Sequence, residues 1–310
     1  MRNKVKARLK RAAYMFLTFI IIAALIVAGV IIGIDIVDMF RAGTVNRQVQ
    51  EMYHSGLSRG GVFAFMGRAY AGEAPAGADG MDEFAPDTSL NVQEDFALLY
   101  EENPDIIGWL TAGGDIDLPV VQRDNEYYLN HNFYGQVDSN GTVFLNEMNV
   151  FYPRDKVLLI HGHNMRSGAM FGQLRKYADE AYMRGHALIT FRTIYDEQTP
   201  YYVPVAAFDA SMQPQAAGYF DVTPMNFATD EQCRDYLEQV LEKSYWSAPA
   251  DVTYEDELLM LITCSYKHED GRFMLLCRKL REDESQMCIR DSLRGGCVRK
   301  LPAILGGRAV

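Results

Sequence analysis

Between Ile106 and Cys277 the chain alternates short apolar runs with turn-forming residues. Runs of this length, rich in Val, Ile, Leu and aromatic residues, are typical of β-strands joined by tight turns. Many short strands in succession bury their apolar faces by closing into a barrel or by stacking as two sheets, so this pattern predicts an all-β barrel or sandwich. The apolar runs cover residues 106–110, 118–121, 142–145, 157–160, 187–191, 201–208, 258–264 and 272–277.

Three helices are expected around these strands. Asn91 to Glu102 spaces its apolar residues along one helix face, and Pro104 ends the pattern. A second helix is expected from about Ser167 to Ala181. A third spans about Thr229 to Tyr245, where Thr229 is a suitable N-cap and the apolar residues again follow one face.

The N-terminal part of the chain has a different composition. Residues 12–34 carry no charge, and 23 residues at about 1.5 Å each are long enough to cross a bilayer. Lys and Arg without any acid precede this segment, so the positive-inside rule places the N-terminus in the cytoplasm and the rest of the chain outside. A cleaved signal peptide is the alternative, but the segment exceeds the usual length and no clear cleavage site follows. We predict a single-pass membrane protein.

Composition divides the chain into five segments. The linker is rich in Ala, Gly, Pro and acid, and the tail turns basic and Gly-rich after SQMCIRDS, which resembles translated sequencing-adapter sequence. We therefore interpret the tail as non-native and assign no function to its Cys288 and Cys297. The segments are a basic cytoplasmic stretch (1–11), a transmembrane helix (12–34), an extracytoplasmic linker (35–90), the folded domain (91–284) and the tail (285–310).

Charge and cysteine content narrow the function. The formal net charge of −11 at pH 7 argues against nucleic acid as a partner. The five cysteines are odd in number and none has CxxC spacing, so neither a disulfide framework nor a zinc site is indicated. An exported domain of this kind is stabilised by its core, which leaves a thiol free for chemistry.

Cys264 is the best candidate for a reactive thiol. It ends the apolar run in LITCSY, and the end of a strand gives a side chain access to solvent. A cysteine attacks a carbonyl carbon as the thiolate, so it needs such access and a nearby base or cation. A core cysteine is the alternative interpretation, and Cys233 and Cys277 have weaker claims to reactivity.

A second strand ends in polar residues at His161-Gly162-His163, within KVLLIHGHNM. A histidine in this position can act as a general acid or base near neutral pH. His161 and His163 share a strand face and could also form half of a metal site, although no further His or Cys cluster completes it. A structural histidine remains the third interpretation.

Arg272 begins the apolar run that follows Cys264. A turn over Lys267 to Gly271 would form a hairpin and return Arg272 towards Cys264. A guanidinium stays charged and offers five donors, which suits an oxyanion or substrate carbonyls. A solvated hairpin arginine is the alternative.

Together these segments resemble the sortases, specifically class B, over about residues 91–282. The resemblance is carried by NPDIIGWL, LPVVQRDNEYYLNHNFYG, GTVFLNE, IHGHNMRSGAMFGQLRKY, and LITCSY followed by GRFMLL, in family order. It implies an eight-stranded sortase-type β-barrel with added helices, and it implies His163, Cys264 and Arg272 as the catalytic set. Two positions depart from the family pattern, because His161 stands where tyrosine is more familiar and Asn146 where aspartate is expected.

The resemblance further implies transpeptidation without a cofactor or metal. Cys264 would attack the threonine carbonyl of a C-terminal sorting motif in a secreted protein, and the thioacyl intermediate would pass to an amine of a cell-wall precursor or a pilin. Thr263 is expected to contact substrate or to be a buried strand residue. A wall-associated cysteine peptidase using the same Cys and His is the first alternative function, and a non-catalytic surface adhesin is the second.

Overall fold

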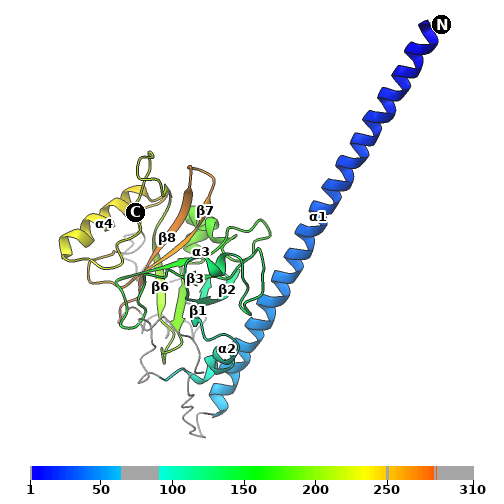
Figure 1. The fold of residues 1–310 in the computed structure, drawn as a ribbon. Coiled ribbons are helices and arrows are strands. Elements are labelled where there is room, and N and C mark those ends of the chain that lie inside the picture. The colour runs from blue at the N-terminus through cyan, green and yellow to red at the C-terminus, as the bar shows by residue number, and fades with distance from the viewer. Residues whose placement is uncertain (1, 64–90, 249–250, 283, 285–310) are drawn as a thin grey trace, which may run out of the picture. The chain divides into compact units, whose positions relative to one another are not determined.

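The computed structural model describes residues 2–63, 91–248, 251–282 and 284 (Figure 1). It divides into one unit up to Thr44 and a second from Val45. Within helix α1 (Arg2–Phe63), the stretch Tyr14–Ile31 has a mean hydropathy of 2.7 and is long and apolar enough to cross a membrane. A signal sequence would meet the same criteria. The predicted tail 285–310, its two cysteines and residues 64–90 of the predicted linker lie outside the described residues.

Eight strands form a closed barrel in the order β1-β2-β3-β4-β7-β8-β6-β5, and pairing of β1 with β5 closes it. The predicted barrel is therefore confirmed, and each predicted apolar run overlaps one strand. β4 and β7 run parallel, whereas β7 and β8 form an antiparallel hairpin. The strands are β1 (Ile106–Ala112), β2 (Ile116–Val121), β3 (Phe144–Leu145), β4 (Val157–His161), β5 (Ile189–Thr193), β6 (Tyr201–Ser211), β7 (Leu258–Ser265) and β8 (Gly271–Lys279).

The strands are apolar on both faces, and β7 shows why. Leu259 and Leu261 belong to a cluster with members from all eight strands, as expected of a barrel interior. Met260 and Ile262 alternate with them and pack in a second cluster together with residues of helix α4 (Asp230–Lys243). The even-numbered residues of β7 therefore face outwards, and the strand reads as a continuous apolar run because α4 and its flanking loops cover the outer face.

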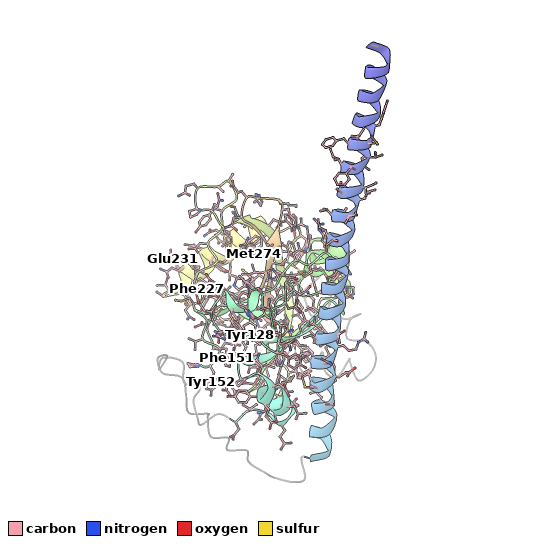
Figure 2. The ribbon with its side chains drawn as sticks, turned by 45° about the vertical axis from the view of Figure 1, so that its right-hand side comes forward. Tyr128, Phe151, Tyr152, Phe227, Glu231 and Met274 are labelled. Carbon is pink, nitrogen blue, oxygen red and sulfur yellow. The ribbon has the colours of Figure 1, made fainter. Side chains whose placement is uncertain are left out.

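Helix α4 confirms the predicted third helix. Thr229 caps it by accepting a hydrogen bond from the Gln232 N–H at 3.3 Å, and the buried side chains of the helix face the barrel. The helix lies beside the strands in Figure 1 and packs on β6. In Figure 2, Phe227 and Glu231 lie at this helix, whereas Met274 of β8 lies among crowded side chains.

The predicted helix from Ser167 to Ala181 is only partly correct. The structure has a 3-10 helix η3 (Leu174–Ala178) and a short helix α3 (Glu180–Gly185), preceded by an irregular segment. Positive φ angles at Gly168 (86°) and Met170 (50°) prevent a continuous helix there. The apolar spacing of the segment instead places Phe171 and Leu174 in the barrel interior.

The packed domain begins earlier in the sequence than the predicted start at Asn91. Val45, Val49 and Tyr53 of α1 are buried in a third cluster, and the Tyr53 ring stacks on Trp109 of β1 with 4.1 Å between centroids. The predicted linker 35–90 therefore includes helical residues that pack on the barrel. Only one residue per turn of this part of α1 is buried, and polar residues lie between the buried ones. Such a narrow apolar stripe is hard to recognise in the sequence.

Candidate active site

Strand register brings the predicted catalytic residues to one place. β4 and β7 pair in parallel up to His161 opposite Ile262, and the Gly162 N–H extends the ladder by donating to the Ile262 carbonyl at 3.1 Å. His163 and Cys264 each follow two residues after this last pair, and both line the same cleft. Across the hairpin, Cys264 lies opposite Arg272, which confirms the predicted turn.

These residues line a cleft of about 270 Å³. Cys264 and Arg272 lie on the same strand face as Ile262, so the cleft opens on the outer wall of the barrel beside the strand ends and not into its interior. Sequence reasoning did not single out Asn125, Leu129, Phe144, Met212, Val222 or Ile262, and four of these six lie outside the strands. The lining residues are Asn125, Leu129, Phe144, Asn146, His161, Gly162, His163, Met212, Val222, Ile262, Thr263, Cys264 and Arg272.

Cys264 is the exposed thiol among the three cysteines of the described chain. Cys233 and Cys277 are buried, and burial raises the pKa of both thiols. A thiol held protonated inside a core is a poor nucleophile. Accessibility therefore singles out Cys264 for chemistry.

The GHNM segment holds the ends of β4 and β7 together. The His163 ring donates from Nε2 to the Leu129 carbonyl at 2.7 Å, since a carbonyl can only accept. Asn164 Nδ2 donates to the Cys264 carbonyl at 2.9 Å, which fixes the backbone that carries the thiol. The described residues show no hydrogen bond from the Cys264 thiol to His163 or Arg272. Catalytic hydrogen bonds are often loose before substrate binds.

Arg272 retains free donors. Its Nη1 contacts the Asp270 carboxylate at 2.9 Å and the Gly271 carbonyl at 3.0 Å. Within the described chain, Nε and Nη2 make no hydrogen bond. The side chain is 31% exposed, so it can turn these donors towards a ligand in the cleft.

Thr263 is anchored in the structure. It is 2% exposed, and its hydroxyl donates to the Gly162 carbonyl at 2.7 Å. This bond links β7 to the end of β4, as expected of a buried strand threonine. A contact between Thr263 and substrate stays a prediction.

The two histidines of the HGH segment have different surroundings. The His161 ring stacks on Phe144 with 5.3 Å between centroids, and its Nε2 lies 3.2 Å from Asn146 Nδ2. Burial, together with the positive charge of Arg272, lowers the pKa of His161 to about 4. No group of three or more His, Cys, Asp or Glu side chains in the described parts of the chain is arranged to hold a metal ion.

A charged cluster lies behind the hairpin and was missed by sequence reasoning. The Asp209 side chain is 2% exposed and accepts hydrogen bonds from Arg175 at 2.8 Å, from Ser265 and from Tyr245. Burial alone would raise the pKa of Asp209, but these hydrogen bonds outweigh it and lower the pKa. An acid directly after the apolar run 201–208 was the available signal.

Comparisons with known proteins decide the family. No family model matches the chain. Sortase B of Listeria monocytogenes is 32% identical over 197 residues, which cover 62% of this chain and 77% of that protein. The chain belongs to the class B sortases. Sortase B of Staphylococcus aureus is 25% identical over 195 residues and is covered to the same 77%.

Solved sortase B structures share the fold. A Staphylococcus aureus sortase B-substrate complex matches with a TM-score of 0.61 at 19% identity and covers 76% of this chain and 95% of its own. Sortase B from Bacillus anthracis matches with a TM-score of 0.60 at 23% identity, and the match covers 79% of this chain and 99% of that structure's chain. These structures show the barrel of the family, and the likeness to the Listeria monocytogenes protein shows that the chain is a sortase-type cysteine transpeptidase.

Proposed function

We propose that this class B sortase cleaves a C-terminal sorting motif after threonine and joins the protein to a cell-wall or pilin amine. The single observation that carries the proposal is the convergence of an exposed Cys264 with His163 and Arg272 in one cleft. A nucleophile, an acid–base group and a fixed cation are the groups that acyl transfer through a thioester requires.

In the first half-reaction, the Cys264 thiolate forms a bond to the threonine carbonyl carbon of an LPxTG-like or NPQTN-like motif. Arg272 donates from its free Nε and Nη2 to the oxyanion that develops. The C–N bond then breaks, and His163 gives a proton to the departing amine. The N-terminal part of the substrate stays on Cys264 as a thioester.

In the second half-reaction, an amine of a cell-wall precursor or a pilin lysine attacks the thioester carbon. Neutral His163 takes a proton from this amine, the new C–N bond forms, and the C–S bond breaks to restore the Cys264 thiolate. The cycle needs no cofactor, because each proton and electron pair is returned.

The proposal includes an anchored topology. Residues 12–34 would span the membrane once, with the basic residues 1–11 in the cytoplasm and the barrel outside the cell. The apolar window Tyr14–Ile31 supports this placement. An enzyme on the outer surface of a Gram-positive membrane would meet its secreted substrates as they emerge.

Peptide transfer by the full chain in detergent tests the proposal. Sorting peptides of both motif types are incubated with and without an amine acceptor, and products are identified by mass. Acceptor-dependent ligation supports the transpeptidase, whereas hydrolysis that ignores the acceptor would indicate a peptidase. If Cys264→Ala leaves the product yield unchanged, the Cys264 thiol mechanism is wrong. If the wild type forms no product with any peptide, a non-enzymatic surface role becomes the better account.

A further inference from the structure

The two positions that depart from the family pattern contact each other in the cleft. Asn146 directly follows β3, and His161 ends the neighbouring strand β4. Asn146 Nδ2 lies 3.2 Å from His161 Nε2. Both residues line the cleft that holds Cys264 and Arg272.

Hydrogen bonds fix the orientation of the Asn146 amide. Its Oδ1 accepts from the Met148 N–H at 3.0 Å, so Nδ2 is the atom directed at His161. An amide nitrogen can only donate, and His161 Nε2 must therefore accept. The proton of a neutral His161 ring then resides on Nδ1.

The His161 ring is neutral at physiological pH because burial and the charge of Arg272 lower its pKa to about 4. Its Nδ1–H is consequently a permanent donor. No residue in the described ranges accepts a hydrogen bond from it. Donors in such partly buried sites normally have a partner, and this one belongs to a ring that lines the substrate cleft.

We propose that His161 is a substrate-binding residue whose Nδ1–H donates to a carbonyl oxygen of the sorting peptide, with Asn146 holding the ring in the required tautomer. This inference rests on the proposed function. The neighbouring Arg272 also favours an electron-rich oxygen at this place in the cleft. A single donor held rigidly by Asn146 and by stacking on Phe144 would fix the register of the peptide relative to Cys264.

Histidine NMR tests the tautomer in the protein without substrate. The ¹⁵N shifts of His161, assigned by comparison with His161→Phe, should show a protonated Nδ1 and an unprotonated Nε2 between pH 6 and pH 8. A protonated Nε2 would overturn the inference, whatever the activity of the variant.

A backbone-ester scan tests the contact itself in the full chain. Replacing one amide of the sorting peptide by an ester weakens its carbonyl as an acceptor. The wild type should show a KM that rises about tenfold at one position, the size of one lost hydrogen bond. His161→Phe should have a similarly raised KM with every peptide and a nearly unchanged kcat. Its KM should not rise further when the ester stands at the position that raises the KM of the wild type.

His186→Phe is the matched control, because its ring stacks on Tyr182 of α3 and does not line the cleft. His186→Phe should show the same dependence of KM on the position of the ester as the wild type. Equal ester effects in wild type and His161→Phe would contradict the contact while leaving the proposed function intact. Absence of transfer by the wild type with every peptide would instead refute the proposed function.

Discussion

The two faces of the β7–β8 hairpin carry the same residue type in opposite environments. Cys264 lies on the outer face, is exposed and lines the cleft. Cys277 lies on the inner face, is 0% exposed, and burial raises the pKa of its thiol. Because alternate residues of a strand point to opposite faces, one hairpin places its reactive side chains outside and its core side chains inside. Changes on the outer face should therefore alter activity, and changes on the inner face should alter the stability of the fold.

The largest effect should come from the two thiols themselves. Cys264→Ala should lower peptide transfer by at least ~10³-fold, because it removes the nucleophile, while the thermal unfolding midpoint stays close to that of the wild type. Cys277→Ala should keep transfer within about threefold and lower the free energy of unfolding by about 1 kcal/mol through a small cavity. Lost activity in Cys277→Ala together with lost stability in Cys264→Ala would contradict this assignment of the two faces.

Thiol labelling should separate the same two residues by rate. A thiol reagent should modify Cys264 in the native protein and reach Cys277 only through opening of the barrel. If that opening costs about 5 kcal/mol, labelling of Cys277 should be at least ~10³-fold slower. Peptide mapping by mass spectrometry over time measures both rates, and denaturant should equalise them. Similar native rates would show that the inner face is open.

Arg272 lies opposite Cys264 on the outer face of the hairpin. Arg272→Gln should lower kcat/KM by about 10²-fold, because the oxyanion loses a charged donor. The kcat/KM of Arg272→Lys should lie between those of the wild type and Arg272→Gln, because lysine keeps the charge but lacks the planar set of donors of a guanidinium. Arg234→Gln on α4, outside the cleft, is the matched control. Equal activity of Arg272→Gln and the control would exclude a role in transfer.

Asp209 is the inner-face counterpart of Arg272. Asp209→Asn should lower the free energy of unfolding at pH 7 by about 2 kcal/mol, because it removes the charge of a buried carboxylate paired with Arg175, whose side chain is 36% exposed and therefore partly screened by solvent. The pKa of Asp209 is lowered in the folded state, so its stabilisation is complete above the ordinary Asp pKa and is lost as pH falls through the folded pKa.

Urea unfolding at several pH values measures this contribution. The difference between wild type and Asp209→Asn should shrink below about pH 4, where the unfolded carboxyl takes up its proton. A difference that stays constant with pH would show that packing, and not charge, explains the loss.

The smallest expected effect concerns His161. Its folded pKa is about 4, below the unfolded value, so the unfolded state takes up the proton first and stability falls as pH drops from about 6.5 to about 4. After a discount for partial exposure, we expect about 1–2 kcal/mol. His161→Phe should lack this part of the pH dependence in urea unfolding. Parallel curves for the two proteins would contradict the lowered pKa.

Much of the fold could be predicted because barrel strands leave a strong local pattern. The runs ending at Cys264 and beginning at Arg272 were placed in one hairpin from their spacing alone, and the register confirms it. The helix at Asp230–Lys243 was equally readable from its cap and its apolar face. Short-range spacing determines such elements, so a single sequence suffices.

Other features depend on partners distant in the sequence. The helix expected from Ser167 failed because positive φ at Gly168 and Met170 redirects the chain into the barrel, which apolar spacing does not report. The pairing of Asn146 with His161 depends on β3 lying beside β4, and the long connection between these two strands carries no hairpin signal. The lining residues Asn125 and Leu129 were missed for a similar reason, since they lie outside the strands and far from Cys264 in the sequence.

The central claim is that Cys264 carries the substrate as a thioester. The most direct measurement is the intact mass of the full chain after a short incubation with a sorting peptide and no amine acceptor. We predict a mass increase equal to the peptide segment ending at threonine, located on Cys264 by peptide mapping and discharged when an amine is added. Peptide consumption with no adduct on Cys264, or with the adduct on another residue, would contradict the account.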